Sequence, residues 1–254
     1  MTLRRIVFGF VVLAALGGGA LFVLDRTIFA PVAVSTGAPV APTLAVPAPT
    51  QPAAAPTEAS TAPAESSTGA SEAGAVLYRI DAAQSEVRYE VDETLFNQNN
   101  RLNTAIGRTR GIAGDVLIDF AQPSNSQIGE IVIDVSQFTS DQSRRDNYIR
   151  RSGLESSRYP YARFVTQAIE GLPERVAVGD QVTFTISGDM TVRETARPVT
   201  WNVTLRLEDG RVAGSASTEI LMSDFGVGPI RLPILATEDL VKLFLDFVAM
   251  PVEG

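Results

Sequence analysis

The clearest pattern in the chain is an unbroken alternation of apolar and polar residues from Val199 to Glu208. A period of two with β-branched and aromatic residues is typical of a half-buried strand. The polar residues 193–198 predict a turn before this strand, and the residues 190–192 predict a short strand before the turn. The apolar face of the long strand is formed by Val199, Trp201, Val203, Leu205 and Leu207.

Similar patterns recur over the residues 76–250 and predict an antiparallel sandwich or barrel. The Asp209-Gly210 pair predicts a tight hairpin turn, because these residues readily adopt two positive φ angles. The segment 143–159 alone breaks the rhythm and predicts one or two short helical turns. No long helices separate the strands, which is typical of all-β folds. The other predicted strands lie near residues 87–91, 115–120, 131–135, 164–166, 182–186, 212–221 and 240–250.

The residues 1–30 predict a signal anchor that crosses a membrane once. The run Ile6–Leu24 is uncharged, and nineteen helical residues span roughly 28 Å, about the thickness of the hydrocarbon layer. Arg4 and Arg5 precede it, so we expect the N-terminus in the cytoplasm and the C-terminal domain in a periplasm or on the cell surface. A cleaved signal peptide is the alternative, although the run is longer than a usual signal core.

The residues 31–75 predict a disordered linker rich in Ala, Pro and Thr. They hold eight of the fifteen prolines and no basic residue. Such a segment buries too little apolar surface to offset the entropy of ordering. Fully extended it reaches on the order of 140 Å, so we expect it to hold the domain of residues 76–254 away from the membrane.

Composition excludes several classes of function. The chain has no cysteine and no histidine, which removes disulfides, thiol and histidine catalysis and the usual zinc sites. The net charge is -8, whereas nucleic-acid-binding proteins usually carry a basic excess. We therefore expect no enzyme, no metal, no cofactor and no nucleic-acid partner.

Charged residues offer three further hypotheses. The arginine cluster of residues 144–158 can bind an anionic head group, with Arg145 and Arg150 as candidates, or it is a solvated surface. Catalysis by paired carboxylates needs two acids facing one cleft. Asp115 and Asp119 alternate with apolar residues that we expect inside, so both acids are expected to face solvent. The glycosylation sequon at Asn202 lies within a predicted strand and is interpreted as chance.

Four motifs in order make the residues 76–254 resemble the YceI-like family of lipid- and polyisoprenoid-binding proteins. They are Tyr78-x-Ile80-Asp81 with Ser85-x-Val87; Arg145-Asp146 with Ile149, Ser152, Leu154 and Tyr159-Pro160-x-x-x-Phe164; Met190-Thr191-Val192-Arg193 with Arg197-Pro198-Val199; and Ser223-Asp224-Phe225-Gly226. Two positions depart from the family pattern, Gln84 and Glu194, and the stretch 92–114 is long and polar.

The resemblance implies an extended eight-stranded antiparallel barrel, similar to lipocalins, with an apolar pore for a polyisoprenoid or isoprenoid-quinone tail. We expect an isoprenoid-like lipid as ligand and the cell membrane as a partner through the N-terminal helix. A barrel with a filled core that serves as an interaction or adhesion module remains the alternative. The expected pore lining is Tyr89, Val116, Ile118, Ile131, Ile133, Phe164, Phe184, Ile186, Val199, Trp201, Val203, Leu205, Phe225 and Phe247.

Overall fold

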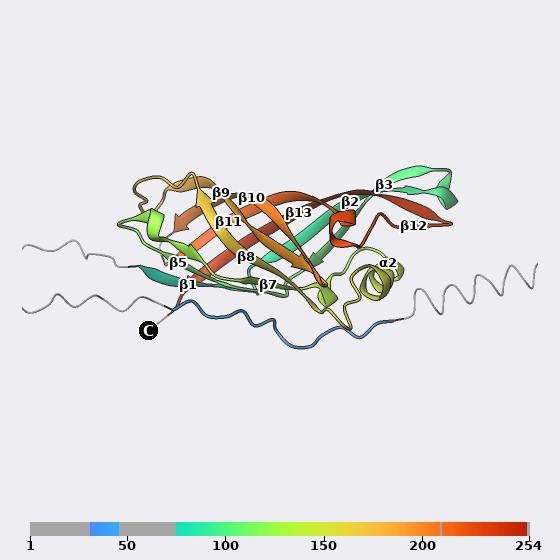
Figure 1. Ribbon diagram of the computed structural model, residues 1–254, viewed down its shortest axis with the longest axis horizontal. Coiled ribbons are helices and arrows are strands. Elements are labelled where there is room, and N and C mark those ends of the chain that lie inside the picture. The colour runs from blue at the N-terminus through green and yellow to red at the C-terminus, as the bar shows by residue number, and fades with distance from the viewer. Residues whose placement is uncertain (1–30, 46–74, 209, 253–254) are drawn as a thin grey trace, which may run out of the picture.

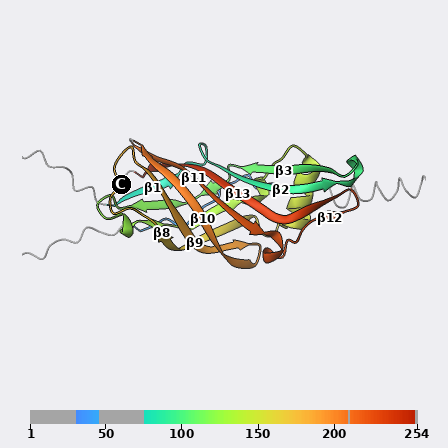
Figure 2. The same ribbon diagram turned by 90° about the horizontal axis from the view of Figure 1, so that it is seen from above.

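One strongly curled antiparallel sheet makes up most of the computed structural model, which describes residues 31–45, 75–208 and 210–252. The sheet wraps around an apolar interior and is elongated along one axis (Figures 1 and 2). Its strands are β1 (Val76–Ile80), β2 (Glu86–Leu95), β3 (Arg101–Thr109), β4 (Ile112–Ala113), β5 (Asp115–Ile118), β6 (Gln127–Ile128), β7 (Ile131–Asp134), β8 (Tyr161–Glu170), β9 (Gln181–Val192), β10 (Thr195–Glu208), β11 (Arg211–Leu221), β12 (Arg231–Leu232) and β13 (Leu235–Pro251).

The strands pair in the order β4-β7-β8-β9-β10-β11-β13-β1-β5-β6, and β2 and β12 also pair with β13 while β3 pairs with β2. The all-β antiparallel expectation is confirmed. The sheet has thirteen strands rather than the expected eight, and some of them, such as β4 and β6, are only two residues long. Within the described residues, no ladder joins β6 to β4, so backbone pairing leaves the sheet open between its two ends.

The alternation in β10 predicted its burial correctly. Val199, Trp201, Val203 and Leu207 are buried, and the polar residues between them lie outward. The preceding turn is tighter than expected: Val192 pairs with Thr195, which leaves only Arg193 and Glu194 in the turn. Glu208 pairs with Arg211, as expected for the second hairpin.

The sequence predicted no strand in the long polar stretch 92–114, and this was wrong. It contains β3, which pairs with β2 along its whole length and extends the hairpin to one end of the molecule (Figure 1). The residues of β3 that face the interior are small, with Ala105 and Gly107 buried beside Thr109. They give no large apolar alternation that would reveal a strand in the sequence.

The expected solvent position of Asp115 was also wrong. Asp115 is 2% exposed and accepts hydrogen bonds from Arg79 at 2.8 and 3.0 Å. This ion pair compensates the cost of removing a carboxylate from water. Asp119, by contrast, accepts from the backbone amides of Ala121 and Gln122 and holds a loop. Both acids therefore have structural partners.

The helical turns lie where the sequence placed them. The helix α2 (Ser143–Tyr148) continues into a π-helical turn, Ile149–Gly153. Four 3-10 turns complete the domain: Phe96–Gln98, Pro123–Asn125, Val135–Gln137 and Met222–Phe225. No helix within the described ranges is long and apolar enough to cross a membrane. The run Ile6–Leu24, expected to do so, lies outside those ranges.

The residues 31–45, which the sequence assigned to the linker, lie along the outside of the domain. We call this segment the strap; it runs from beside α2 at Pro31 toward β1 (Figure 1). The amide of Ser35 donates to Ser136 Oγ at 3.0 Å, and its hydroxyl donates to Asp134 Oδ2. Near the other end, Arg79 donates to Thr43 Oγ1 at 3.3 Å. These hydrogen bonds, together with the burial of Pro39, place the strap.

We expect Ser35→Ala to loosen the strap while leaving the domain folded. The change removes a hydroxyl that bonds to Asp134 and accepts from Gln137, which costs about 1 kcal/mol. Amide exchange of residues 31–45 should therefore speed up about fivefold, measured by mass spectrometry on the full chain. The exposed neighbour Thr36, changed to alanine, is the control. Equal protection in both variants would contradict this role of Ser35.

Candidate functional site

An apolar cavity lies inside the curl of the sheet, at the end near α2. Its volume is about 140 Å³, and no charged side chain lines it. The strands β2, β7, β8, β9, β10, β11 and β13 line it, together with the π-helical turn and the loop before β12. The lining residues are Val87, Tyr89, Val91, Ile133, Val135, Phe138, Ile149, Gly153, Leu154, Ala162, Met190, Val192, Trp201, Ile220, Met222, Phe225, Val227, Ile230, Val241 and Leu243.

Two aromatic side chains form opposite parts of the cavity wall. Tyr89 on β2 lies directly over Gly107 of the paired strand β3, where any Cβ would come within 2.2 Å of its ring. Its ring meets Phe138 edge-on at 5.2 Å between centroids. Trp201 on β10 meets Phe164 in the same way at 6.3 Å. These contacts fix both rings, so the cavity is shaped before any ligand arrives.

Tyr89 adds a phenol to this wall without adding charge. Burial raises the pKa of Tyr89 well above its ordinary value, and the nearby charge of Asp146 raises it further. The phenol is therefore neutral at every physiological pH. A neutral lining can accept an apolar molecule without the cost of burying a charge.

A second, smaller apolar cavity of about 50 Å³ lies toward the opposite end of the sheet. It is lined by Val116, Ile118, Phe120, Pro123, Ser126, Ile128, Ile169, Leu172, Val176, Val182, Phe184, Leu205 and Leu207. Together the two cavities show that the interior is neither solid nor a continuous tunnel.

Buried side chains between the cavities form what we call the plug: Ile131, Phe164, Ile186 and Val203. On β10, Val203 lies between Trp201 of the larger cavity and Leu205 of the smaller one. Phe164 pairs across the sheet with Met190 of β9 and with Ile131 of β7. All four plug residues belong to one core cluster and are at most 9% exposed. The plug therefore limits how far a ligand in the larger cavity can reach.

The expected pore lining divides between these three places. Tyr89, Ile133, Trp201 and Phe225 line the larger cavity. Val116, Ile118, Phe184 and Leu205 line the smaller one. Ile131, Phe164, Ile186 and Val203 form the plug, and Val199 and Phe247 pack in the surrounding core. All fourteen thus face the interior region, but only four contact the larger cavity.

Sequence reasoning missed most of this lining, both on the strands and outside them. Outside the strands, Ile149 and Gly153 come from the π-helical turn, Leu154 follows it, and Val227 and Ile230 come from the loop that precedes β12. Ile149 and Leu154 did carry a signal, because they are apolar residues in a strongly charged segment. Gly153 carries no such signal, because it contributes to the cavity only by lacking a side chain.

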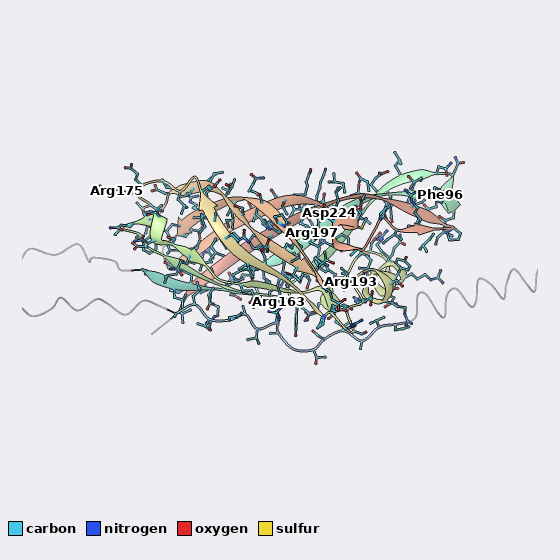
Figure 3. All side chains as sticks on the ribbon, viewed as in Figure 1. Phe96, Arg163, Arg175, Arg193, Arg197 and Asp224 are labelled. Atoms are coloured by element: carbon cyan, nitrogen blue, oxygen red, sulfur yellow. The ribbon has the colours of Figure 1, made fainter. Side chains whose placement is uncertain are left out.

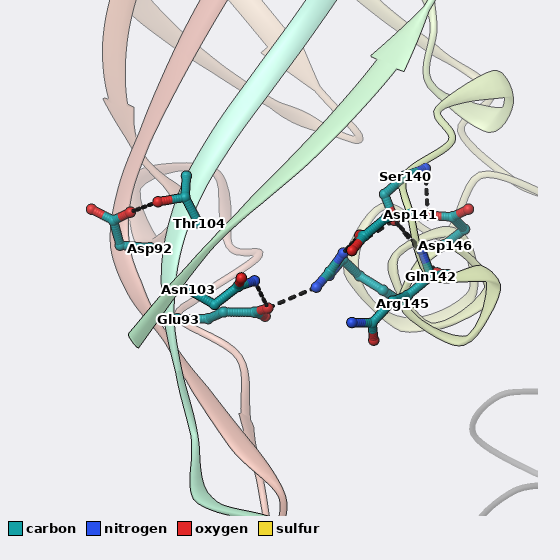
Figure 4. A network of polar contacts seen from close by, with 9 residues as sticks. All are labelled: Asp92, Glu93, Asn103, Thr104, Ser140, Asp141, Gln142, Arg145 and Asp146. Carbon is teal, nitrogen blue, oxygen red and sulfur yellow. Dashed lines mark hydrogen bonds and ion pairs between the residues drawn. The ribbon is translucent and has the colours of Figure 1, made fainter. Parts of the chain in front are cut away.

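A polar network lies beside this end of the domain (Figure 4). Glu93, 3% exposed, accepts from Arg145 at 2.7 Å and from Asn103 at 2.8 Å. Arg145 also pairs with Asp141. Burial works against the charge of Arg145, and the two acids outweigh it, so the pKa of Arg145 is raised. The network ties α2 to the β2–β3 hairpin.

The two expected head-group arginines already have partners within the protein. Arg145 is held by the acids just described. Arg150 is 7% exposed and donates to the carbonyls of Ser136 and Phe138, each at 2.7 Å. Their guanidinium groups therefore join α2 and the π-helical turn to the sheet. They are engaged within the protein and are not proposed as a head-group site.

No carboxylate lines either apolar cavity. Two acids, Glu219 and Asp224, line a separate groove together with Arg197. Within residues 31–45, 75–208 and 210–252, no group of three or more acidic side chains is placed to hold a metal ion. Asp134, fully buried, accepts instead from Ser136, Gln137 and Ser35.

Known proteins with a similar sequence or structure agree with this fold. A family model described as the YceI-like domain matches residues 78–249. A UPF0312 protein of Pseudomonas putida (strain GB-1) is 29% identical over 131 residues, covering 48% of this chain and 64% of that protein. This chain thus spans slightly less than two thirds of the length of that curated relative.

Two solved structures share the fold. The crystal structure of BcnA from Burkholderia cenocepacia has a TM-score of 0.53 at 23% identity, covering 67% of this chain and 99% of that one. A polyisoprenoid binding domain from Saccharophagus degradans, implicated in plant cell wall breakdown, has a TM-score of 0.51 at 15% identity, covering 70% and 99%. At these identities the likeness shows the fold alone.

Proposed function

Because the chain belongs to the YceI-like domain family, we propose that its domain binds an isoprenoid-like lipid, with part of a polyprenyl or quinone tail in the larger cavity. The observation that carries this proposal is the uncharged, preformed cavity of about 140 Å³. The fold neighbour from Saccharophagus degradans, described as a polyisoprenoid binding domain, supports it.

The size of the cavity sets the length of tail that is held. An apolar cavity of about 150 Å³ stays dry and can take up benzene, so this one holds roughly one or two isoprene units. Each buried CH₂ contributes about 0.8 kcal/mol relative to water. A tail taken from a bilayer gains less, because it has already left water. The remaining tail therefore extends beyond the cavity unless the plug moves.

The proposal includes the cellular setting. The run Ile6–Leu24 anchors the chain in the cell membrane, and the domain lies outside the cytoplasm, in a periplasm or at the cell surface. An anchored domain remains close to the bilayer that contains such lipids. The lipid is a ligand, and the proposed activity is binding without chemical conversion.

The filled plug favours a second candidate function. A domain whose interior cannot accept a long tail can act as an interaction or adhesion module and bind a protein partner through its surface. The four plug residues support this reading, because they separate the two cavities completely enough for each to have its own lining. The two candidates differ in whether any lipid enters.

Lipid recovery and the fluorescence of the single tryptophan distinguish them. We expect the full chain, purified in detergent, to yield about one isoprenoid per chain on lipid extraction and native mass spectrometry. A quinone with a short isoprenoid tail should quench Trp201 saturably, because Trp201 lines the cavity. Geraniol should compete with that quinone. No recovered lipid together with unchanged fluorescence would remove the lipid function and leave the interaction module.

A further inference from the structure

One end of the long axis is a tip that presents apolar side chains, amides and arginines but no acid. We define the tip as residues 95–102 and 230–236, which come from the β2–β3 hairpin and the β12–β13 hairpin. Leu95 pairs with Leu235, and the amide of Phe96 donates to the carbonyl of Ile234 at 2.9 Å, so the two segments form one unit. The tip contains arginine as its only charged residue type, although the chain carries a net charge of -8.

Two large apolar side chains of the tip lie in solvent. Leu102 is 80% exposed and Phe96 is 45% exposed. Arg101 and Arg231, both exposed, flank them. Exposed apolar residues next to cations, without acids, match the interface of an anionic bilayer, where apolar groups enter the acyl boundary and cations meet phosphates.

The strap begins at the end of the domain that carries the tip, and it is close in sequence to the predicted anchor. Pro31 lines a surface groove with Arg150 and Arg158, so the described chain begins beside the π-helical turn. Figure 1 shows this point and the tip at the same end of the long axis, and Figure 3 shows Phe96 there with Arg175 at the opposite end. Only residues 25–30 separate Pro31 from the run Ile6–Leu24, at most roughly 25 Å of chain.

The larger cavity lies next to the tip. Ile230, the first tip residue of the second segment, is itself part of the cavity lining. Val91 and Val241, further along β2 and β13, line the cavity on the same strands that lead to the tip. The lining of the larger cavity thus reaches the base of the tip at Ile230.

We propose that the tip inserts into the membrane interface, with Phe96 and Leu102 in the acyl boundary and Arg101 and Arg231 at the phosphates. The inserted tip brings the part of the larger cavity that Ile230 lines close to the bilayer. This inference rests on the proposed lipid function for its purpose, but its test does not. The occupant of the tip is the bilayer surface of the membrane that holds the anchor.

A single-cysteine label tests the insertion directly, because the chain has no native cysteine. The full chain carrying Leu102→Cys, labelled with an environment-sensitive fluorophore, is reconstituted in vesicles of equal parts phosphatidylcholine and phosphatidylglycerol. Val178→Cys is the matched control, because Val178 is 66% exposed in the β8–β9 loop at the opposite end. We expect a blue-shifted emission at position 102, with at least about threefold stronger quenching by lipid-borne spin labels than at position 178.

Equal quenching at the two positions would overturn the proposal, as would strong quenching at position 178 alone. Phe96→Cys gives a second position on the tip, should the first variant reconstitute poorly. Geraniol binding by the same labelled chains keeps the two hypotheses separate. Bound geraniol with an unquenched label removes only the insertion, whereas a quenched label without any isoprenoid uptake removes only the lipid function.

Discussion

Phe164→Ala is expected to lower the free energy of unfolding by about 3 to 5 kcal/mol and to lengthen the isoprenoid chain that the domain accepts. Phe164 is 7% exposed and supports Trp201 edge-on, so its removal leaves a cavity in the plug. That cavity lies between the two existing ones and joins them. A tail that ended at the plug can then continue toward the smaller cavity, which burial of more CH₂ groups favours.

Isoprenoid alcohols of increasing length measure this effect. In the native chain we expect affinity to level off from geraniol to geranylgeraniol, and in Phe164→Ala to keep rising with length. The longest alcohol should also restore part of the lost thermal stability, because a ligand that binds only the folded state stabilises it. Chemical denaturation and thermal melts of the full chain give the stability, and competition against the quinone gives the affinities.

Phe225→Ala is the matched control for this change. Phe225 is 3% exposed and lines the larger cavity, away from the plug. Its truncation should cost similar stability and enlarge the larger cavity without joining it to the smaller one. If both variants show the same dependence on chain length, the plug does not set the length, and the interior adapts in some other way.

The sequence predicted the strands best where one face is buried and the other is wet. In β10 every large apolar residue alternates with a polar one, so burial could be inferred from the pattern alone. In β3 the buried positions are held by small residues: Ala105 lies opposite Val91, and Gly107 lies where the ring of Tyr89 leaves no room for a side chain. A strand whose partner supplies the bulk leaves no large apolar alternation of its own.

Hydrogen bonds and ion pairs between residues far apart in the chain were the second feature that the sequence could not predict. Asp115 is buried because Arg79 reaches it, and the strap is placed because Ser35 meets Asp134, which is 99 positions away. Composition described residues 31–45 as part of a linker, since it records their prolines and small residues but not their hydrogen-bond partners. The hydrogen bonds that hold them depend on the three-dimensional position of β7 and the following turn.

The sequence predicted which faces of the strands point to the interior, but not where the interior contains a cavity. All fourteen expected lining residues face the interior region, because alternation determines which side a residue takes. Whether an interior residue borders empty space or fills it depends on packing across the sheet. Val203 and Trp201 share one face of one strand, yet Trp201 lines the larger cavity and Val203 belongs to the plug.

Gly153→Leu is expected to abolish lipid uptake while leaving the fold intact. Gly153 is buried in the π-helical turn and lines the larger cavity. A Cβ added there would meet Val227 at 3.8 Å and Ile149 at 4.0 Å, which is ordinary van der Waals contact. The rest of a leucine side chain would then extend into the space that the proposal assigns to the lipid tail. Helical backbone also favours leucine over glycine, so we expect no loss of stability from the backbone.

The size of the expected loss follows from the displaced tail. The four carbons of a leucine side chain displace a similar number of CH₂ groups, about 3 kcal/mol in all, which is on the order of a hundredfold in Kd. Gly153→Ala adds a single carbon at the same backbone position and should weaken binding only about fourfold. Quenching of Trp201 by the short-tailed quinone measures both affinities, and thermal melts confirm that both variants fold. Unchanged affinity in the folded leucine variant would show that the tail does not occupy this cavity, because the two cannot share the space beside Ile149 and Val227.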